Sequence, residues 1–178
     1  MRLVVGLAIL FSTAVLSAQQ SDIIPLERVI KSQRGTVSQK IANTDLTIEY
    51  GRPVARGRAL FGALVTYGRI WHPGADQGTT FATTREIQVN GQALPAGKYS
   101  LWTIPGAESW TFIFSRDAEA FHTSYPGESR DALRVTVKPE QGAHMESMAY
   151  YFPAVDGKDA TLRLHWGTVM VPLAIKVP

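Results

Sequence analysis

Apolar and polar residues alternate with a period of two along most of this chain, the pattern of half-buried β-strands. In residues 44–50, Leu46, Ile48 and Tyr50 fall on one face and polar residues fall on the other. The same alternation predicts further strands at 36–41, 84–89, 110–115, 133–137, 148–152, 161–166 and 169–177. Residues 98–104 are apolar on both faces, which predicts a strand that is covered on both sides.

Turn residues separate these strands. Asn90-Gly91 accepts the positive φ angles of a type I′ turn and is the strongest hairpin signal in the chain. Ala42-Asn43 and residues 156–159 predict two more tight turns, and Gly167-Thr168 predicts a hairpin that ends the chain. Because Pro172 has no N–H to give to a ladder, we expect the last strand to be an edge strand or to carry a bulge.

Helical signals are few and short. Leu60, Phe61, Leu64 and Val65 have helical spacing, which predicts a short helix docked on the sheet, and residues 117–121 predict another. About eight to ten strands joined by turns, without a helix long enough for a crossover, indicate an all-β fold. We therefore expect an antiparallel β-sandwich with one or two short helices.

The N-terminus resembles a cleaved secretory signal peptide. Arg2 precedes an apolar stretch from Leu3 to Leu16 that ends in small residues. This stretch is too short to span a membrane, and Gln19 stands where a lipoprotein would have its acylated cysteine. We expect a signal peptide at 1–18, a tether at 19–35 and one sandwich domain at 36–178, in a periplasmic or secreted protein with no membrane insertion after cleavage.

Composition narrows the possible chemistry. The chain has no cysteine, which excludes thiol catalysis, disulfide exchange and cysteine metal sites. Without Arg2, 17 basic and 15 acidic residues remain, so the surface is close to neutral and nucleic acid is not an expected partner. The four histidines, at positions 72, 122, 144 and 165, lack the close spacing of a zinc or iron site, and we expect no metal and no cofactor.

One connection between strands is too long to be a simple turn of the sandwich. Almost thirty residues separate the strand that ends at Tyr50 from the strand that starts near Thr79, and such long connections are commonly functional or disordered. We call this segment the 52–80 loop. It carries a set of arginines with a single acidic residue, and the candidate ligand-binding residues are Arg52, Arg56, Arg58, Arg69, Trp71, His72, Asp76, Thr79 and Thr80.

Two interpretations of the arginines remain open. A guanidinium can hold a carboxylate, phosphate or sulfate with two parallel hydrogen bonds, which favours an anion or polar-polymer site. The structural alternative is that the arginines pair with Glu49, Asp76 and Glu86 and pin the loop. Trp71 is likewise either an exposed stacking surface or a plug at the end of the sandwich.

A set of motifs along the chain is similar to a known family. The residues that carry it are 38–41, 45–53, 56–58, 61–62, 67–68, Trp71, 74–75, 79–80 and 94–101. They resemble the bacterial exported family called domain of unknown function 2911, over roughly residues 38–177. The resemblance implies a β-rich exported or envelope domain and assigns no activity and no catalytic residue. In the family pattern arginine is usual at position 72 and asparagine at 76, so it gives His72 and Asp76 no essential role.

These observations favour a non-catalytic binding module that uses the 52–80 loop to hold an unknown protein, a glycan or a small anionic ligand. The alternative is a secreted hydrolase or lyase acting on an anionic substrate, with His72 or Asp76 as acid or base. No serine-nucleophile elbow or phosphate-cradling glycine loop is present. A metal site formed by His72, Asp76 and His165 is a further possibility. The catalytic residues of such an enzyme stay unknown at this stage.

Overall fold

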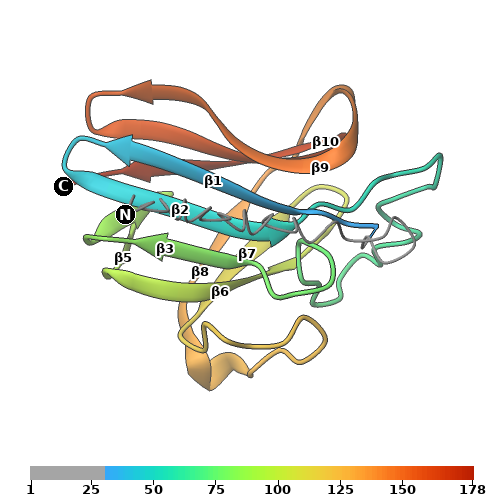
Figure 1. Ribbon diagram of the computed structural model, residues 1–178, viewed down its shortest axis with the longest axis horizontal. Coiled ribbons are helices and arrows are strands. Elements are labelled where there is room, and N and C mark those ends of the chain that lie inside the picture. The colour runs from blue at the N-terminus through green and yellow to red at the C-terminus, as the bar shows by residue number, and fades with distance from the viewer. Residues whose placement is uncertain (1–30) are drawn as a thin grey trace, which may run out of the picture.

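The computed structural model describes residues 31–178, which form two antiparallel sheets that face each other (Figure 1). In spatial order the larger sheet contains β1 (Arg34–Ile41), β2 (Thr44–Gly51), β3 (Thr80–Thr83), β6 (Gly97–Ile104), β7 (Trp110–Ser115) and β8 (Asp131–Val137). The smaller sheet contains β5 (Gln92–Leu94), β4 (Ile87–Val89), β10 (Asp159–Lys176) and β9 (Glu140–Asp156). The predicted all-β antiparallel sandwich is confirmed.

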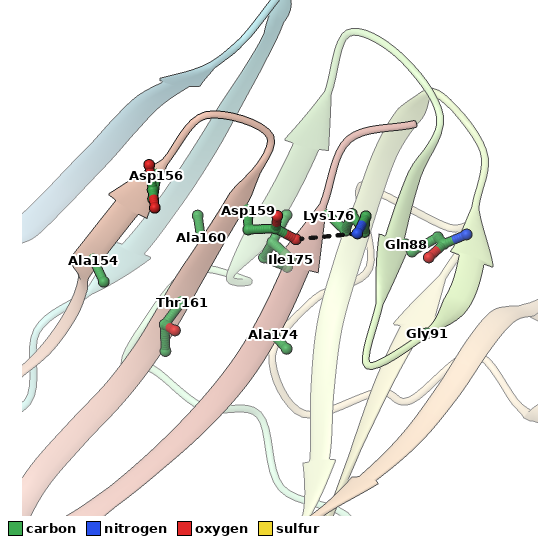
Figure 2. A pocket seen from close by; sticks show the side chains of 10 residues that line it. All are labelled: Gln88, Gly91, Ala154, Asp156, Asp159, Ala160, Thr161, Ala174, Ile175 and Lys176. Atoms are coloured by element: carbon green, nitrogen blue, oxygen red, sulfur yellow. Dashed lines mark ion pairs between the residues drawn. The ribbon is translucent and has the colours of Figure 1, made fainter.

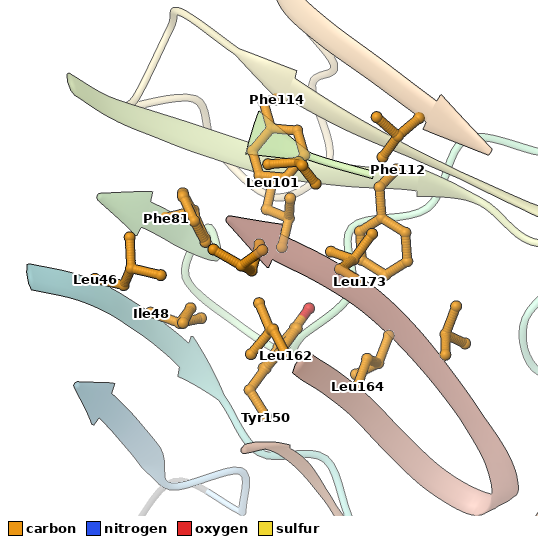
Figure 3. Packing of buried hydrophobic residues seen from close by; sticks show 14 of the residues in the cluster. Leu46, Ile48, Phe81, Leu101, Phe112, Phe114, Tyr150, Leu162, Leu164 and Leu173 are labelled. Carbon is orange, nitrogen blue, oxygen red and sulfur yellow. The ribbon is translucent and has the colours of Figure 1, made fainter. Parts of the chain in front are cut away.

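The inner faces of the two sheets share one apolar core (Figure 3). Phe81 and Phe114 of the larger sheet meet edge to face with ring centroids 5.1 Å apart. Leu162 and Leu173 of the smaller sheet are each 1% exposed. Burying each such side chain contributes roughly 1.5–3 kcal/mol, so the alternation seen in the sequence is the main source of stability.

Residues 98–104 behave as the doubly apolar pattern predicts. Leu101 of β6 points into the core, and Trp102 on the opposite face is only 2% exposed. The connection between β7 and β8 covers that outer face, where the Trp102 and Tyr125 ring centroids lie 5.6 Å apart. Both faces of β6 are therefore shielded from water.

All three predicted tight turns lie at hairpin ends, and the one at 156–159 joins β9 to β10, where Asp156 pairs with Asp159. Asn90 and Gly91 have φ angles of 49° and 77° between β4 and β5, which agrees with the predicted type I′ turn. Ala42 has a φ of 50° at the turn between β1 and β2. The strand predicted at 84–89 is shorter than expected, because the chain passes from one sheet to the other between Thr83 and Ile87.

The reversal predicted at Gly167-Thr168 is present, but as a sharp bend inside one strand rather than as a turn between two strands. Residues 159–176 form one continuous strand, β10, with register shifts on both sides of Gly167. Gly167 has a φ of 58°, and its bend carries the end of the strand back until the Val177 N–H donates to the Lys158 carbonyl at 2.8 Å. Pro172 lies between the residues that pair with β9 and those that pair with β4. The strand carries its irregularities between Thr161 and Val169 rather than at Pro172, and it is an inner strand of the sheet.

Neither predicted helix forms. Residues 60–65 make a tight turn in which the Gly62 N–H donates to the Val65 carbonyl at 2.9 Å and Leu64 is 49% exposed. Gly62 has a φ of 82°, which stops a helix from propagating through so short a segment. Residues 117–121 contain a single turn, and the 3-10 helix η2 is at Glu128–Arg130 instead.

The predicted signal peptide at 1–18 and most of the tether at 19–35 lie outside the described residues, and β1 already begins at Arg34. Within residues 31–178, no helix has the length and apolar character needed to cross a membrane.

Candidate functional site

The 52–80 loop crosses one end of the sandwich, the end opposite to the C-terminus (Figure 1). On one side it is bound to β9, where the Ala55 N–H donates to the Glu146 carbonyl at 2.8 Å and the Met148 N–H to the Pro53 carbonyl at 2.9 Å. On the other side, Trp71 and Thr103 of β6 exchange two backbone hydrogen bonds of 2.7 and 2.8 Å. The loop is therefore tied to both sheets.

An aromatic cluster lies beneath the loop. The indole rings of Trp71 and Trp166 are stacked with an interplanar angle of 10° and a centroid distance of 6.3 Å. Phe61 meets Trp71, Trp110 and Trp166 edge to face at 5.0–6.1 Å. Trp71 thus plugs the end of the sandwich, as one of the two interpretations expects, while part of its surface stays accessible.

Two of the four arginines of the loop, Arg52 and Arg58, bind backbone carbonyls rather than carboxylates. Arg58 donates from Nε to the Ala55 carbonyl at 2.9 Å and from Nη2 to the Val54 carbonyl at 2.6 Å. Arg52 donates from Nε to the Met148 carbonyl at 3.2 Å. Carbonyl partners hold the loop in place but leave the positive charge uncompensated.

The pairing with Glu49, Asp76 and Glu86 that the structural alternative required is absent. Within residues 31–178, no ion pair involves Arg52, Arg56, Arg58 or Arg69. The Arg56 backbone N–H does reach the Glu146 carboxylate, with Oε1 at 2.6 Å. The side-chain hydrogen bond from His144 and this backbone bond together lower the pKa of Glu146.

A basic hollow of about 390 Å³ opens between the loop and the aromatic cluster. Its lining comprises Lys31, Ser32, Pro53, Val54, Arg56, Arg58, Leu64, Val65, Trp71, Gly74, Ala75 and Trp166. This set contains three cationic side chains and no acidic residue. Arg58 has committed two of its five N–H donors to carbonyls, so the others remain for a ligand.

A second hollow, of about 500 Å³, lies beyond Trp71, and we call it the aromatic hollow. Its lining comprises Ile70, Trp71, His72, Gly74, Ala75, Trp102, His122, Thr123 and Tyr125. Trp71, Gly74 and Ala75 line both hollows and therefore form the wall between them. The arginines are in one hollow and His72 is in the other.

His72 is a buried, neutral imidazole. Its Nε2 accepts a hydrogen bond from the backbone N–H of Thr79, so this nitrogen carries no proton. Burial, together with the positive potential of His122 and Arg34, lowers the pKa of His72 from 6.5 to about 4. At neutral pH the proton of the ring is therefore on Nδ1.

Other predicted residues support the loop without lining either hollow. The Thr79 hydroxyl donates to the Pro73 carbonyl at 3.2 Å, and the Thr80 hydroxyl donates to Glu49 at 3.5 Å. Asp76 has a φ of 63° and is exposed, as is Arg69. Of the nine candidate residues, the structure brings Arg56, Arg58 and Trp71 to the basic hollow and Trp71 and His72 to the aromatic hollow.

His72, Asp76 and His165 do not form a metal site. The Nε2 of His165 is 3.0 Å from the Ala143 carbonyl, and its Nδ1 is 3.4 Å from the Tyr151 hydroxyl, away from the loop. No cluster of three potential His, Asp or Glu ligands is present in the part of the chain that the structure describes.

Sequence reasoning missed the partners that come from distant segments, among them Trp102, His122, Tyr125 and Trp166. For Trp102 and Tyr125 the sequence does contain one signal. Residues 98–104 are apolar on both faces, so something had to cover Trp102, and the irregular segment after residue 116 is what covers it. For His122 and Trp166 the sequence gives no such signal.

A third hollow, of about 380 Å³, lies at the opposite end of the molecule between β9, the two limbs of β10 and β4 (Figure 2). Small apolar side chains such as Ala154, Ala160 and Ala174 form its walls. Lys176 and Asp159 pair across its rim at 3.6 Å. Because these charges already satisfy one another, the two hollows at the 52–80 loop are the better candidates.

Comparison with known proteins gives one match. A family model described as "Protein of unknown function (DUF2911)" matches residues 32–175, which include both hollows except for Lys31. No curated protein and no solved structure matches the chain.

Proposed function

This chain belongs to the DUF2911 family, whose function is unknown, and we propose that it is an exported, non-catalytic binding module that holds an anionic ligand in the basic hollow. The ligand class is a carboxylate, phosphate or sulfate attached to an apolar or ring-shaped group. The leader-like sequence at 1–18 supports export to the periplasm or the medium.

The observation that carries the proposal is the charge of the hollow. Lys31, Arg56 and Arg58 line it, no acidic residue does, and no described carboxylate lies within ion-pairing distance of either guanidinium. Glu146 attracts Arg56 without forming an ion pair and does not line the hollow. The lining therefore keeps its positive charge beside an apolar floor, which favours a ligand that carries negative charge. The stacked rings of Trp71 and Trp166 supply that floor.

Separation of the chemical groups favours binding over catalysis. A hydrolase or lyase of the kind considered above needs the arginines and His72 around one substrate. Trp71, Gly74 and Ala75 stand between them, and the Nε2 of His72 is occupied by the Thr79 N–H. A general base must be within hydrogen-bond reach of the proton that it removes, and this imidazole has its basic nitrogen turned into the protein.

Titration with 8-anilinonaphthalene-1-sulfonate, an aromatic sulfonate, tests the proposal. We expect saturable binding that weakens as salt is added, because salt screens the attraction. The double variant Lys31→Ala/Arg56→Ala should weaken binding by about tenfold or more, since charge-assisted hydrogen bonds are worth ~1.5–3 kcal/mol. Uncharged N-phenyl-1-naphthylamine should bind the wild-type and variant proteins equally.

Arg69→Ala is the matched control, because Arg69 lies in the same loop, has no described partner and lines neither hollow. It should leave sulfonate binding unchanged. Equal binding by the Arg69→Ala protein and the double variant would contradict the proposal. So would a sulfonate affinity that does not respond to salt.

A further inference from the structure

The aromatic hollow differs from the basic hollow in carrying no charged side chain. None of its lining residues is Asp, Glu, Lys or Arg, and the low pKa of His72 keeps that imidazole neutral at pH 7. Its walls are instead the rings of Trp71, Trp102 and Tyr125 with two histidines and Thr123. An anion therefore finds no formal countercharge here.

The polar ends of two of the aromatic residues are already used. The Tyr125 hydroxyl donates to the Asp131 carboxylate at 2.8 Å and accepts from Arg134 Nη2 at 2.8 Å. Trp102 Nε1 donates to the Ser100 hydroxyl at 3.0 Å. These bonds fix the two rings. Trp102 is only 2% exposed and backs the hollow, whereas the half-buried Tyr125 can offer ring surface to a ligand.

The histidines provide the polar groups that remain available. The Thr79 N–H fixes the tautomer of His72, so its Nδ1 is a hydrogen-bond donor; this atom has no described protein partner and is not sealed from solvent. Neither ring nitrogen of His122 has a hydrogen-bond partner within residues 31–178, and its Nδ1 is buried. The two imidazole centroids are 6.0 Å apart.

These features select against several ligands. A metal ion would need an unprotonated nitrogen, and the only one on His72 is bound to Thr79. A purely hydrocarbon ligand would leave the His72 N–H without an acceptor in a dry site, which costs ~1–3 kcal/mol. The hollow needs a ligand with an apolar face and with a hydrogen-bond acceptor for the His72 N–H. A pyranose ring has both, because its C–H face packs on aromatic rings and its hydroxyl groups accept and donate hydrogen bonds at the edge.

We propose that the aromatic hollow is a binding subsite for an uncharged sugar ring, which stacks on Trp71 and accepts a hydrogen bond from His72 Nδ1. The aromatic hollow shares only Trp71, Gly74 and Ala75 with the basic hollow, and its other lining residues are its own. If the proposed function also holds, one glycan with a neutral and an anionic unit can occupy both hollows, and that extension rests on the proposed function.

Solution NMR of ¹⁵N-labelled protein at pH 7 tests the proposal with three uncharged probes: maltopentaose, cellopentaose and N,N′,N″-triacetylchitotriose. We expect at least one to give saturable shifts at the indole N–H of Trp71 and at the His72 ring. His122→Ala should weaken that binding by about tenfold or more. The His72 ring spectrum should show the Nδ1–H tautomer before the sugar is added.

Two variants serve as controls. Arg69→Ala changes an exposed side chain of the same loop that lines neither hollow, so it should retain binding. Lys31→Ala/Arg56→Ala should also retain it, so failure of this proposal is distinguishable from failure of the proposed function.

Several results would overturn the proposal. They are no saturable shift with any of the three sugars, equal binding by the His122→Ala protein, or an Nε2–H or charged His72 at pH 7. Tighter binding of N-phenyl-1-naphthylamine in the same hollow, displacing the sugar, would show a site for apolar ligands instead.

Discussion

His72 is held neutral by its surroundings rather than by a charged partner. It is 6% exposed, its Nε2 accepts the Thr79 N–H, and Gly74 packs against the same edge of the ring, where a Cβ would lie 2.8 Å from Cε1. Protonation would break the bond to Thr79 and place a charge near His122 and Arg34. The same contacts that fix the tautomer therefore make the fold sensitive to acid.

The stability of the protein should fall between pH 6.5 and pH 4 because of His72. The folded-state pKa is about 4 and the unfolded value is 6.5, so in this window the unfolded chain binds a proton that the folded chain does not. The contribution is complete above pH 6.5 and is lost by pH 4, roughly 3 kcal/mol in all. Urea denaturation at pH 7 and pH 4 measures it.

His72→Gln should flatten this dependence, because the Gln carbonyl can accept the Thr79 N–H and does not titrate. All other acid-titrating groups are common to the two proteins, so the difference between their pH profiles isolates His72. Parallel profiles would show that burial of His72 does not couple to folding.

The sequence identified which residue types form the candidate site better than it identified their hydrogen-bond partners. The arginine-rich loop was identified from composition, and two of its arginines do reach one hollow. Their carbonyl acceptors could not be foreseen, because every residue has a carbonyl and only the fold decides which ones are within reach. His122 gave no signal at all, since nothing local distinguishes a histidine that will face a hollow from a solvated one.

Among the elements, β10 shows how a bend can resemble a turn in sequence. Gly167 and Thr168 have turn-like chemistry, but the strand continues because β9 is long enough to pair with residues on both sides of the bend. Gly167 adopts a φ of 58°, and a Cβ there would lie 2.8 Å from Cδ1 of Leu60 in the 52–80 loop. The bend therefore also sets where the loop can lie.

Gly167→Ala should destabilise the fold more than Gly157→Ala. Both positions have nearly the same φ, 58° and 57°, so both substitutions should cost about 1–2 kcal/mol for the left-handed backbone. Only Gly167 has a neighbour within 4 Å, which should add about 1 kcal/mol as Leu60 is displaced. Urea unfolding of the two variants measures the difference, and equal costs would mean that the bend and the loop are independent.

At the scale of the whole molecule, the Pro73 carbonyl joins the 52–80 loop to the smaller sheet. It accepts from the Thr79 hydroxyl at 3.2 Å and from the hydroxyl of buried Tyr150, on β9, at 3.0 Å. Burial raises the pKa of Tyr150 well above its ordinary value of 10.0, so this hydroxyl stays a donor at neutral pH. The wall between the two hollows is thus held in place by one carbonyl oxygen that accepts two hydrogen bonds.

Tyr150→Phe and Thr79→Val should each cost about 1 kcal/mol, because either change leaves Pro73 with one donor. The double variant should cost more than the sum by about 1 kcal/mol, since it leaves the buried carbonyl with none. A double-mutant cycle from urea unfolding gives this coupling. Strict additivity would show that the two hydroxyls do not act on the same group.

The sequence alone determined the strands, most of the turns, the all-β class and the position of the long loop, because alternation and turn chemistry are local properties of neighbouring residues. Only the tertiary structure decided that residues 60–65 form a turn, that β10 is continuous, and that the loop encloses two hollows. Those outcomes depend on segments far apart in the chain, such as His72 with His122 and Trp71 with Trp166. Packing of the two sheets brings these residues together, and no local pattern contains that information.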